Sequence, residues 1–288
     1  MRLLPILLLA GLAALMFRGA RGPRPTGVLT VWREKYLPAG WPELAKSGDF
    51  GAVSMKVVDG TSAFQPTEAA RVLEQARAAG LRAFGWGWHN LRDPQEALAE
   101  AARAATEIKR YGLEAYSVNA ENNWAGTEDA PKTANPTQAM AVFVDELRRL
   151  APGVELIFNG YSGEKTSDGR PRLTEELLAK FDAFGPMNYG TKRSTIANKY
   201  RTRSARARGA GGEFAPMHGT GRVASNGAVW GFNTGADGLL ELVREDPPKY
   251  LAFWYGPGSE DMLAFGSSEN ISLSQLMKLS HGKPEAIA

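Results

Sequence analysis

The sequence predicts an α/β fold in which eight parallel strands close into a barrel surrounded by helices, a (β/α)8 or TIM barrel. Short apolar segments alternate with amphipathic segments along most of the 288-residue chain. This alternation is typical of parallel strands joined by right-handed helical crossovers, and eight such units close a barrel. The length agrees, because one barrel domain takes about 250 residues. An open doubly wound sheet is the alternative, but no Gly-x-Gly-x-x-Gly follows the first expected strand.

The expected strands are short runs rich in Val, Leu, Phe and Trp, bounded by Gly, Pro or polar residues. In chain order they are Gly27–Trp32, Gly51–Val58, Arg82–Trp88, Leu113–Val118, Val154–Asn159, Ala183–Asn188, Glu213–Met217 and Tyr250–Tyr255.

The expected helices have recognisable ends. Pro66–Ala79 is followed by Gly80, where a C-cap belongs. Asp93–Tyr111 and Asn135–Leu150 each open with an N-cap residue and then proline. The remaining helices are expected at Trp41–Lys46, Thr174–Lys180, Ser194–Arg208, Gly235–Glu245 and Ser272–Leu279.

The composition limits the chemistry that the chain can use. With 43% hydrophobic and 23% charged residues, a full globular core is possible. The absence of cysteine excludes disulfides, cysteine-ligated zinc and thiol nucleophiles. Neither His-x-His nor His-Glu-x-x-His occurs, so we expect no metal and no cofactor. The net charge of +3 is mildly basic and does not by itself indicate nucleic acid.

The N-terminus predicts export. Leu3 to Phe17 is uncharged and apolar, Arg2 precedes it, and further arginines follow it. Fifteen residues are fewer than the ~20 that span a bilayer, and they suit a secretory signal. However, Arg18 occupies the −3 position of a cleavage site at Ala20. We therefore expect residues 1–24 to be a signal peptide or membrane anchor plus linker, and residues 27–288 to be a single barrel domain. The protein would be periplasmic or extracellular, secreted or membrane-tethered; a buried N-terminal helix is the alternative.

The segment from Lys192 to Arg208 carries seven positive residues and no acidic one. One interpretation is a solvated helix face on the outside of the barrel. The other is electrostatic adhesion to an anionic wall polymer or membrane surface. Tyr200 is the one aromatic residue within it, so we do not expect nucleic acid as a partner.

The end of the fourth expected strand carries a carboxylate, amides and an indole. Successive strand residues point to opposite faces, so Asn119 and Glu121 share a face. A carboxyl group beside a hydrogen-bonding amide and an aromatic platform is suited to acid-assisted cleavage of a sugar. The alternative is a strand that runs into a polar, Asn-rich turn.

Similar residues follow the other expected strands, where the active site of a barrel lies. Indoles mixed with amides are typical of a carbohydrate cleft, because aromatic faces stack on the apolar faces of sugar rings. The candidate substrate-binding residues are Trp32, Trp86, Trp88, His89, Trp124, Asn159, Tyr161, Asn188, His218, Trp254 and Tyr255.

Several of these residues have a structural alternative. His218 could be a hydrogen-bonded core histidine, and His89 could cap the helix that follows it. Tyr189 and Trp254 could close the barrel core. Lys56, inside an expected strand, must find a partner, for which Glu34 or Glu121 is available.

The strand ends resemble those of the retaining glycoside hydrolases that act on N-acetylated sugars, chiefly the family 18 chitinases. In that family strand four ends in Asp-x-Glu, strand six ends in Met-x-Tyr, and strand eight carries a tryptophan under the cleaved sugar. This sequence has Asn119-Ala-Glu121, Met187-Asn-Tyr189 and Trp254 in that order. The resemblance covers roughly residues 27–280 through three short motifs.

The lysozyme-like muramidases of family 25 are also similar, through a barrel and acidic residues on strand four. Their aspartate at the first strand is missing here, where Trp32, Arg33 and Glu34 stand.

The chain departs from the family 18 pattern at Asn119, where that family has an aspartate. The family's aspartate orients the substrate's acetamido group, whose oxygen attacks the anomeric carbon. The endo-acetylglucosaminidases of family 85 use Asn-x-Glu for the same purpose. The resemblance therefore implies that Glu121 is the general acid and base, that Asn119 and Tyr189 hold the acetamido group, and that Trp254 forms the floor under the sugar.

Three functions remain open at this point. The first is a glycosidase that cleaves peptidoglycan or a chitin-type polysaccharide. The second is a non-catalytic carbohydrate-binding barrel, for which Asn119 is the best argument. The third is a two-carboxylate glycosidase on another substrate, with Glu34, Asp59 or Glu164 as the second acid about 5–9 Å from Glu121.

Overall fold

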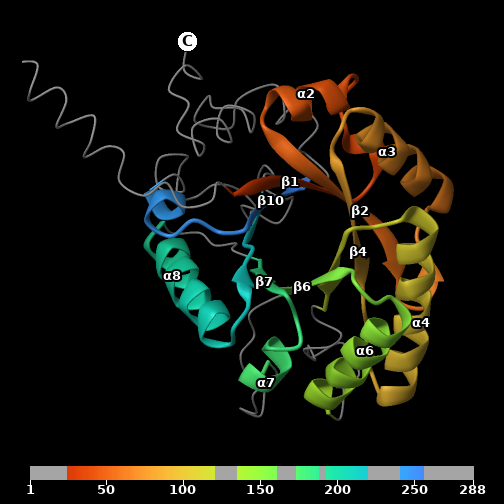
Figure 1. The fold of residues 1–288 in the computed structure, drawn as a ribbon, viewed down its shortest axis with the longest axis vertical. Coiled ribbons are helices and arrows are strands. Elements are labelled where there is room, and N and C mark those ends of the chain that lie inside the picture. The colour runs from red at the N-terminus through yellow and green to blue at the C-terminus, as the bar shows by residue number, and fades with distance from the viewer. Residues whose placement is uncertain (1–24, 121–134, 161–172, 188–192, 220–240, 256–288) are drawn as a thin grey trace, which may run out of the picture.

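The computed structural model describes residues 25–120, 135–160, 173–187, 193–219 and 241–255. Its strands run side by side through the centre of the molecule, and its helices lie around them (Figure 1). The strands are β1 (Thr26–Val31), β2 (Phe50–Asp59), β3 (Ser62–Ala63), β4 (Arg82–Trp88), β5 (Ala115–Asn119), β6 (Glu155–Gly160), β7 (Ala183–Pro186), β8 (Glu213–Phe214), β9 (Met217–Gly219) and β10 (Tyr250–Tyr255).

The sheet order returns on itself, as a barrel requires. The order is β8-β7-β6-β5-β4-β2-β1-β10-β9, and every pair along it is parallel. β8 and β9 form one strand position, because only Ala215 and Pro216 separate them. A further parallel bridge joins Met187, after β7, to Met217 in β9. The eight parallel positions confirm the predicted (β/α)8 barrel; β3 was not predicted and pairs antiparallel with β2.

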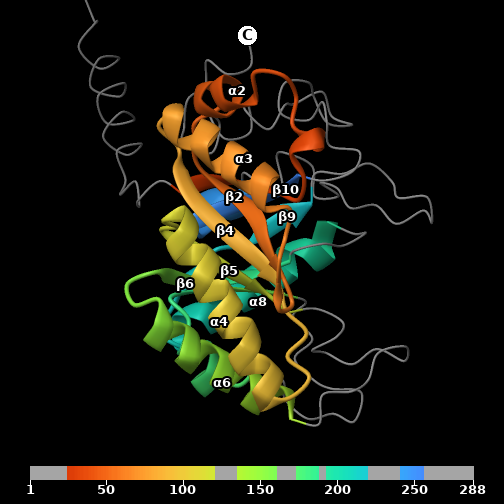
Figure 2. The same ribbon diagram turned by 90° about the vertical axis from the view of Figure 1, so that its right-hand side faces the viewer.

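The helices pack against the outside of the strands, and Figure 2 shows α3, α4 and α6 along one side of the sheet. The 3-10 turn is η1 (Glu34–Tyr36), and the helices are α2 (Trp41–Ser47), α3 (Pro66–Ala78), α4 (Pro94–Tyr111), α6 (Pro136–Leu150), α7 (Glu175–Leu178) and α8 (Arg193–Gly209). Residues 241–245 are also helical.

The helix ends agree with the predicted caps. The Asp93 side chain accepts hydrogen bonds from the backbone of Gln95 and Glu96 at the start of α4. Asn135 caps α6 in the same way, through the backbone N–H of Gln138. Gly112 ends α4 with φ 55°, in the left-handed region that glycine tolerates. The expected helix Ser272–Leu279, most of Gly235–Glu245 and the N-terminal segment 1–24 lie outside the described residues. No helix within the described ranges is long and apolar enough to cross a membrane.

Two apolar layers flank the strands. The barrel interior is filled by one layer of side chains, namely Val28, Ala52, Phe84, Ala115, Ile157, Ala183, Ala215 and Tyr250. The other layer packs between strands and helices and contains the intervening residues, such as Leu29, Val53 and Tyr116. The alternation follows from the period of two in a strand.

The run Phe84-Gly85-Trp86-Gly87-Trp88 in β4 shows why small and large residues alternate. The glycines face the helices, because a Cβ at Gly85 would overlap Leu113 and one at Gly87 would overlap the Tyr116 hydroxyl. The tryptophans face the barrel, so this strand places two indoles on the interior side.

Candidate functional site

Three indoles meet at the C-terminal end of the barrel. Trp254 in β10 lies between the other two: its ring centroid is 5.3 Å from that of Trp86, edge to face, and 6.4 Å from that of Trp32, stacked. Trp86 is 3% exposed and donates its indole N–H to the carbonyl of Val31 at 3.0 Å. Trp32 and Trp254 are partly exposed, as is Trp88 two residues after Trp86. The cluster therefore has a buried base and a surface that a ligand can reach.

Two amides lie on the neighbouring strands. Asn119 at the end of β5 and Asn159 in β6 are register partners, and both are buried. Asn159 Nδ2 donates to Met217 Sδ at 3.4 Å, while its Oδ1 has no hydrogen-bond partner within the described part of the chain. Asn159 and Ser54 line an interior cavity of about 20 Å³, which has room for one water. Asn159 and Ser54 thus place polar groups inside the barrel.

Lys56 finds its partner in its own strand. Lys56 Nζ lies 2.9 Å from Asp59 Oδ2, and its side chain is 7% exposed. Of the two partners considered for Lys56, Glu34 instead binds Arg71, and Glu121 lies outside the described residues. Asp59 is thus a carboxylate at this end of the barrel, and its side chain is 49% exposed.

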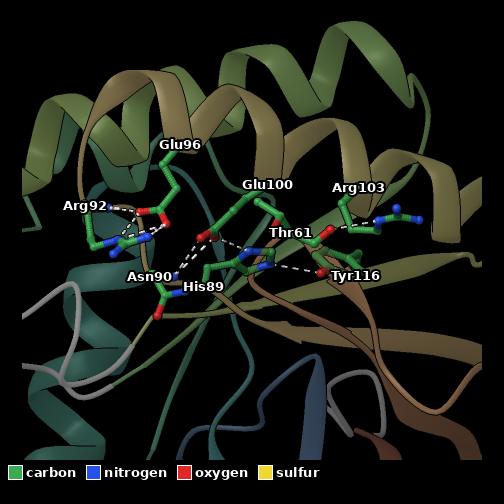
Figure 3. A network of polar contacts seen from close by, with 8 residues as sticks. All are labelled: Thr61, His89, Asn90, Arg92, Glu96, Glu100, Arg103 and Tyr116. Carbon is green, nitrogen blue, oxygen red and sulfur yellow. Dashed lines mark hydrogen bonds and ion pairs between the residues drawn. The ribbon is translucent and has the colours of Figure 1, made fainter.

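His89 belongs to a buried network with α4 (Figure 3). Strand alternation places it on the side opposite Trp86 and Trp88. Its Nδ1 is 2.9 Å from Glu100 Oε2, and its Nε2 is 2.9 Å from the Tyr116 hydroxyl. Glu100 also accepts the backbone N–H of Asn90 at 3.2 Å. His89, Glu100 and Tyr116 have no exposed surface, and burial holds the pKa of Tyr116 well above its usual value. The network joins β4, β5 and α4 and presents no group to the barrel interior.

His218 also faces the helices. Its ring packs against Tyr200 of α8 and Phe253 of β10, with centroids 6.4 Å and 6.3 Å away. Burial lowers its pKa from 6.5 to about 3, so the imidazole is neutral. We therefore leave both His89 and His218 out of the proposed binding surface.

The basic helix α8 uses its arginines to hold neighbouring segments. Arg201 pairs with Glu245 at 2.7 Å, Arg206 pairs with Glu175 at 2.9 Å, and Arg208 pairs with Asp246. The buried Arg203 donates to the Met187 carbonyl at 3.1 Å. Much of the charge that suggested an adhesive surface is thus compensated within the fold.

Several predicted site residues lie outside the described residues, namely Glu121, Trp124, Tyr161, Asn188 and Tyr189. For Tyr255 the structure describes the backbone in β10 but not the side chain. The last described residue before Glu121 is Ala120, whose backbone N–H donates to the Asn159 carbonyl at 3.2 Å. The structure thus brings Trp32, Trp86 and Trp254 together, and it pairs Asn119 with Asn159 at the ends of two other strands.

Sequence reasoning missed the Lys56–Asp59 pair, because residues three apart in a regular strand point to opposite faces. It also missed the Glu100 network, although strand alternation already places His89 on the face opposite Trp88. That alternation is the one sequence signal that could have found it.

The comparisons with known proteins show the fold. No protein-family model matches the sequence, and a search of curated proteins gives no match either. Among solved structures, the chain is similar to a GH18 chitinase from Pseudoalteromonas aurantia, with 10% identity, a TM-score of 0.61, and coverage of 90% of this chain and 100% of that one. It is also similar to an endo-beta-N-acetylglucosaminidase from Cordyceps militaris, with 12% identity, a TM-score of 0.59 and 92% coverage of both chains.

A third similar structure is the Bacillus cereus spore cortex-lytic enzyme SleL, with 10% identity, a TM-score of 0.58, and coverage of 83% of this chain and 73% of that one. The chain therefore has a TIM-barrel fold, and this fold is similar to that of the GH18 chitinase.

Proposed function

We propose that this protein is a glycoside hydrolase that cleaves an N-acetylated polysaccharide of the chitin or peptidoglycan type. The observation that carries the proposal is the cluster of Trp32, Trp86 and Trp254 at the end of the barrel where active sites of this fold lie. Asn119 ends the neighbouring strand β5, in register with Trp88 of β4. The enzymes that share the fold support it, since they include chitinases and an endo-beta-N-acetylglucosaminidase.

In this proposal Glu121 protonates the glycosidic oxygen as the bond to the anomeric carbon breaks. The acetamido oxygen of the same sugar attacks the anomeric carbon, held in place by Asn119 and Tyr189. Glu121 then takes a proton from the water that opens the cyclic intermediate. Asn119 suits the orienting role because it is buried at the end of β5, in register with Asn159. An amide can accept from the acetamido N–H without adding a charge.

The indoles supply the binding surface. Trp254 would lie under the distorted sugar, because it is the partly exposed centre of the cluster. Trp32 and Trp88 would stack on neighbouring sugars, together with Trp124, while Asn159, Tyr161, Asn188 and Tyr255 would bind hydroxyl groups. The buried Trp86 supports Trp254 from below.

The polysaccharide substrate implies work outside the cytoplasm. The apolar segment from Leu3 to Phe17 supports export, with residues 1–24 as signal peptide or anchor. The similarity to a spore cortex-lytic enzyme agrees with a substrate in a cell wall.

The test separates acetamido assistance from ordinary two-carboxylate hydrolysis. The purified chain is incubated with chitin, with fully deacetylated chitosan and with peptidoglycan, and reducing ends are measured. We expect release from an N-acetylated polymer and none from chitosan, because chitosan lacks the attacking oxygen. Equal release from chitosan would refute the assisted mechanism.

A second candidate is a two-carboxylate glycosidase, and one observation favours it: Asp59 is a half-exposed carboxylate at the same end of the barrel. Cleavage of chitosan that is lost in Asp59→Asn would support this alternative. A third candidate, a non-catalytic binding barrel, predicts polymer binding without any release.

A further inference from the structure

Lys56 and Asp59 lie on the same face of β2 because a bulge interrupts the strand between them. Lys56 pairs in register with Trp86 and Asp59 with Trp88, so two steps along β4 correspond to three along β2. Val57 is the extra residue. Bulges are common next to active sites, where they redirect a side chain. Here the bulge brings the Asp59 carboxylate to the barrel-facing side of the strand, beside Lys56.

The Lys56 ammonium is fixed by its surroundings. Its Nζ lies 4.3 Å from the centroid of the Phe64 ring and 5.3 Å from that of Trp86. Its one oxygen partner within the described residues is Asp59, at 2.9 Å. A buried ammonium needs such a partner, because an uncompensated charge is costly inside a protein. Lys56 therefore holds the Asp59 carboxylate in one place.

Asp59 itself stays accessible and lies next to an indole. Its side chain is 49% exposed, whereas that of Lys56 is 7% exposed. The backbone N–H of Gly60 donates to the Trp88 carbonyl at 2.8 Å, which ties the turn after Asp59 to the end of β4. Trp88 is partly exposed. An accessible carboxylate beside an aromatic face can accept hydroxyl hydrogen bonds from a sugar that stacks on that face.

We propose that Asp59, held by Lys56, is the hydrogen-bonding group of the sugar-binding subsite that Trp88 forms at the ends of β2 and β4. The Trp88 indole stacks on the sugar ring, and Asp59 accepts hydrogen bonds from its hydroxyl groups. The charges of Lys56 and Asp59 balance, so this subsite takes an uncharged sugar. The inference rests on the proposed function, because it assigns a hydrogen-bonding partner to the sugar that stacks on Trp88.

Calorimetric titration with the soluble chitin hexasaccharide tests the subsite, with every chain carrying Glu121→Gln to prevent turnover. The test variant is Lys56→Met with Asp59→Ala, which removes both charges together and leaves neither one buried alone. The matched control is Arg82→Met with Glu114→Ala, which removes an ion pair of 2.8 Å at the other end of the barrel. We expect about tenfold weaker binding in the test variant and unchanged binding in the control.

A second variant, Asp59→Glu, keeps the ion pair possible but moves the carboxylate by one methylene, and it too should bind more weakly. Circular dichroism establishes that each variant is folded. If Asp59→Glu and the double variant both bind the hexasaccharide as tightly as the parent chain, the subsite is refuted while the proposed function stays intact. A parent chain that binds no hexasaccharide would overturn the subsite together with its chitin-type substrate.

Discussion

Glu100→Ala should be the most destabilising change in the buried network of Figure 3. Glu100 is fully buried and accepts from His89 Nδ1 at 2.9 Å and from the backbone of Asn90 at 3.2 Å. Truncation leaves both donors buried without a carboxylate and opens a void. Each buried donor left without its partner costs about 1–3 kcal/mol, so the loss of this carboxylate should cost about 2–5 kcal/mol. This is a large part of the ~5–15 kcal/mol by which a domain is stable.

The same helix offers a matched control. Glu96 lies one turn earlier in α4 and pairs with Arg92, whose side chain is 59% exposed. Exposed pairs contribute about 1 kcal/mol or less, so Glu96→Ala should cost little. Urea unfolding followed by tryptophan fluorescence gives both free energies of unfolding. Glu100→Gln should fall between them, because an amide oxygen can still accept from His89. A cost for Glu100→Ala no larger than that for Glu96→Ala would refute the reasoning.

Three further predictions follow from described residues. His218→Leu should make the free energy of unfolding less dependent on pH. In the parent chain the unfolded histidine binds a proton below pH 6.5, whereas the native one binds it only near pH 3. Between these values the parent chain therefore loses about 1.4 kcal/mol of stability per pH unit on acidification. Urea unfolding at pH 4.5 and 7 checks this, and equal slopes for both chains would contradict it. Gly87→Ala should cost about 1–3 kcal/mol in the same assay, because the new Cβ would overlap the Tyr116 hydroxyl and lie 2.8 Å from His89 Nε2; an unchanged midpoint would argue against this packing. Trp254→Ala should weaken chitin-hexasaccharide binding about tenfold in a fluorescence titration, because it removes the centre of the indole cluster. Trp41→Phe, away from the barrel end, should leave binding unchanged, and equal effects of the two would exclude Trp254 from the binding surface.

Much of the fold follows from local sequence patterns. The Asp-Pro and Asn-Pro starts of α4 and α6 predict their N-caps correctly, because those side chains satisfy backbone N–H groups that the helix cannot. The apolar runs predict the parallel strands because both faces of a barrel strand are covered. Strand alternation also predicts that Trp86 and Trp88 share one face.

The partners of polar side chains could not be predicted in the same way. The pairing of Lys56 with Asp59 depends on the bulge at Val57, and no residue type in that strand predicts a bulge. The Glu100 partner of His89 depends on how α4 packs against β4, which is a long-range property. For the two histidines strand alternation alone already indicates the helix-facing side. The residue types at strand ends therefore predicted the site residues less well than the strand face on which each residue lies.

The central claim is that Glu121 cleaves an N-acetylated polysaccharide, and one paired measurement tests it most directly. The full chain and its Glu121→Gln variant are compared for reducing-end release from chitin and from peptidoglycan, and for binding to the same polymers. We predict that release from at least one polymer is lost in Glu121→Gln while binding is retained, since glutamine keeps the shape but cannot donate the proton. Undiminished release by Glu121→Gln would contradict the claim, as would no release by the parent chain from either polymer.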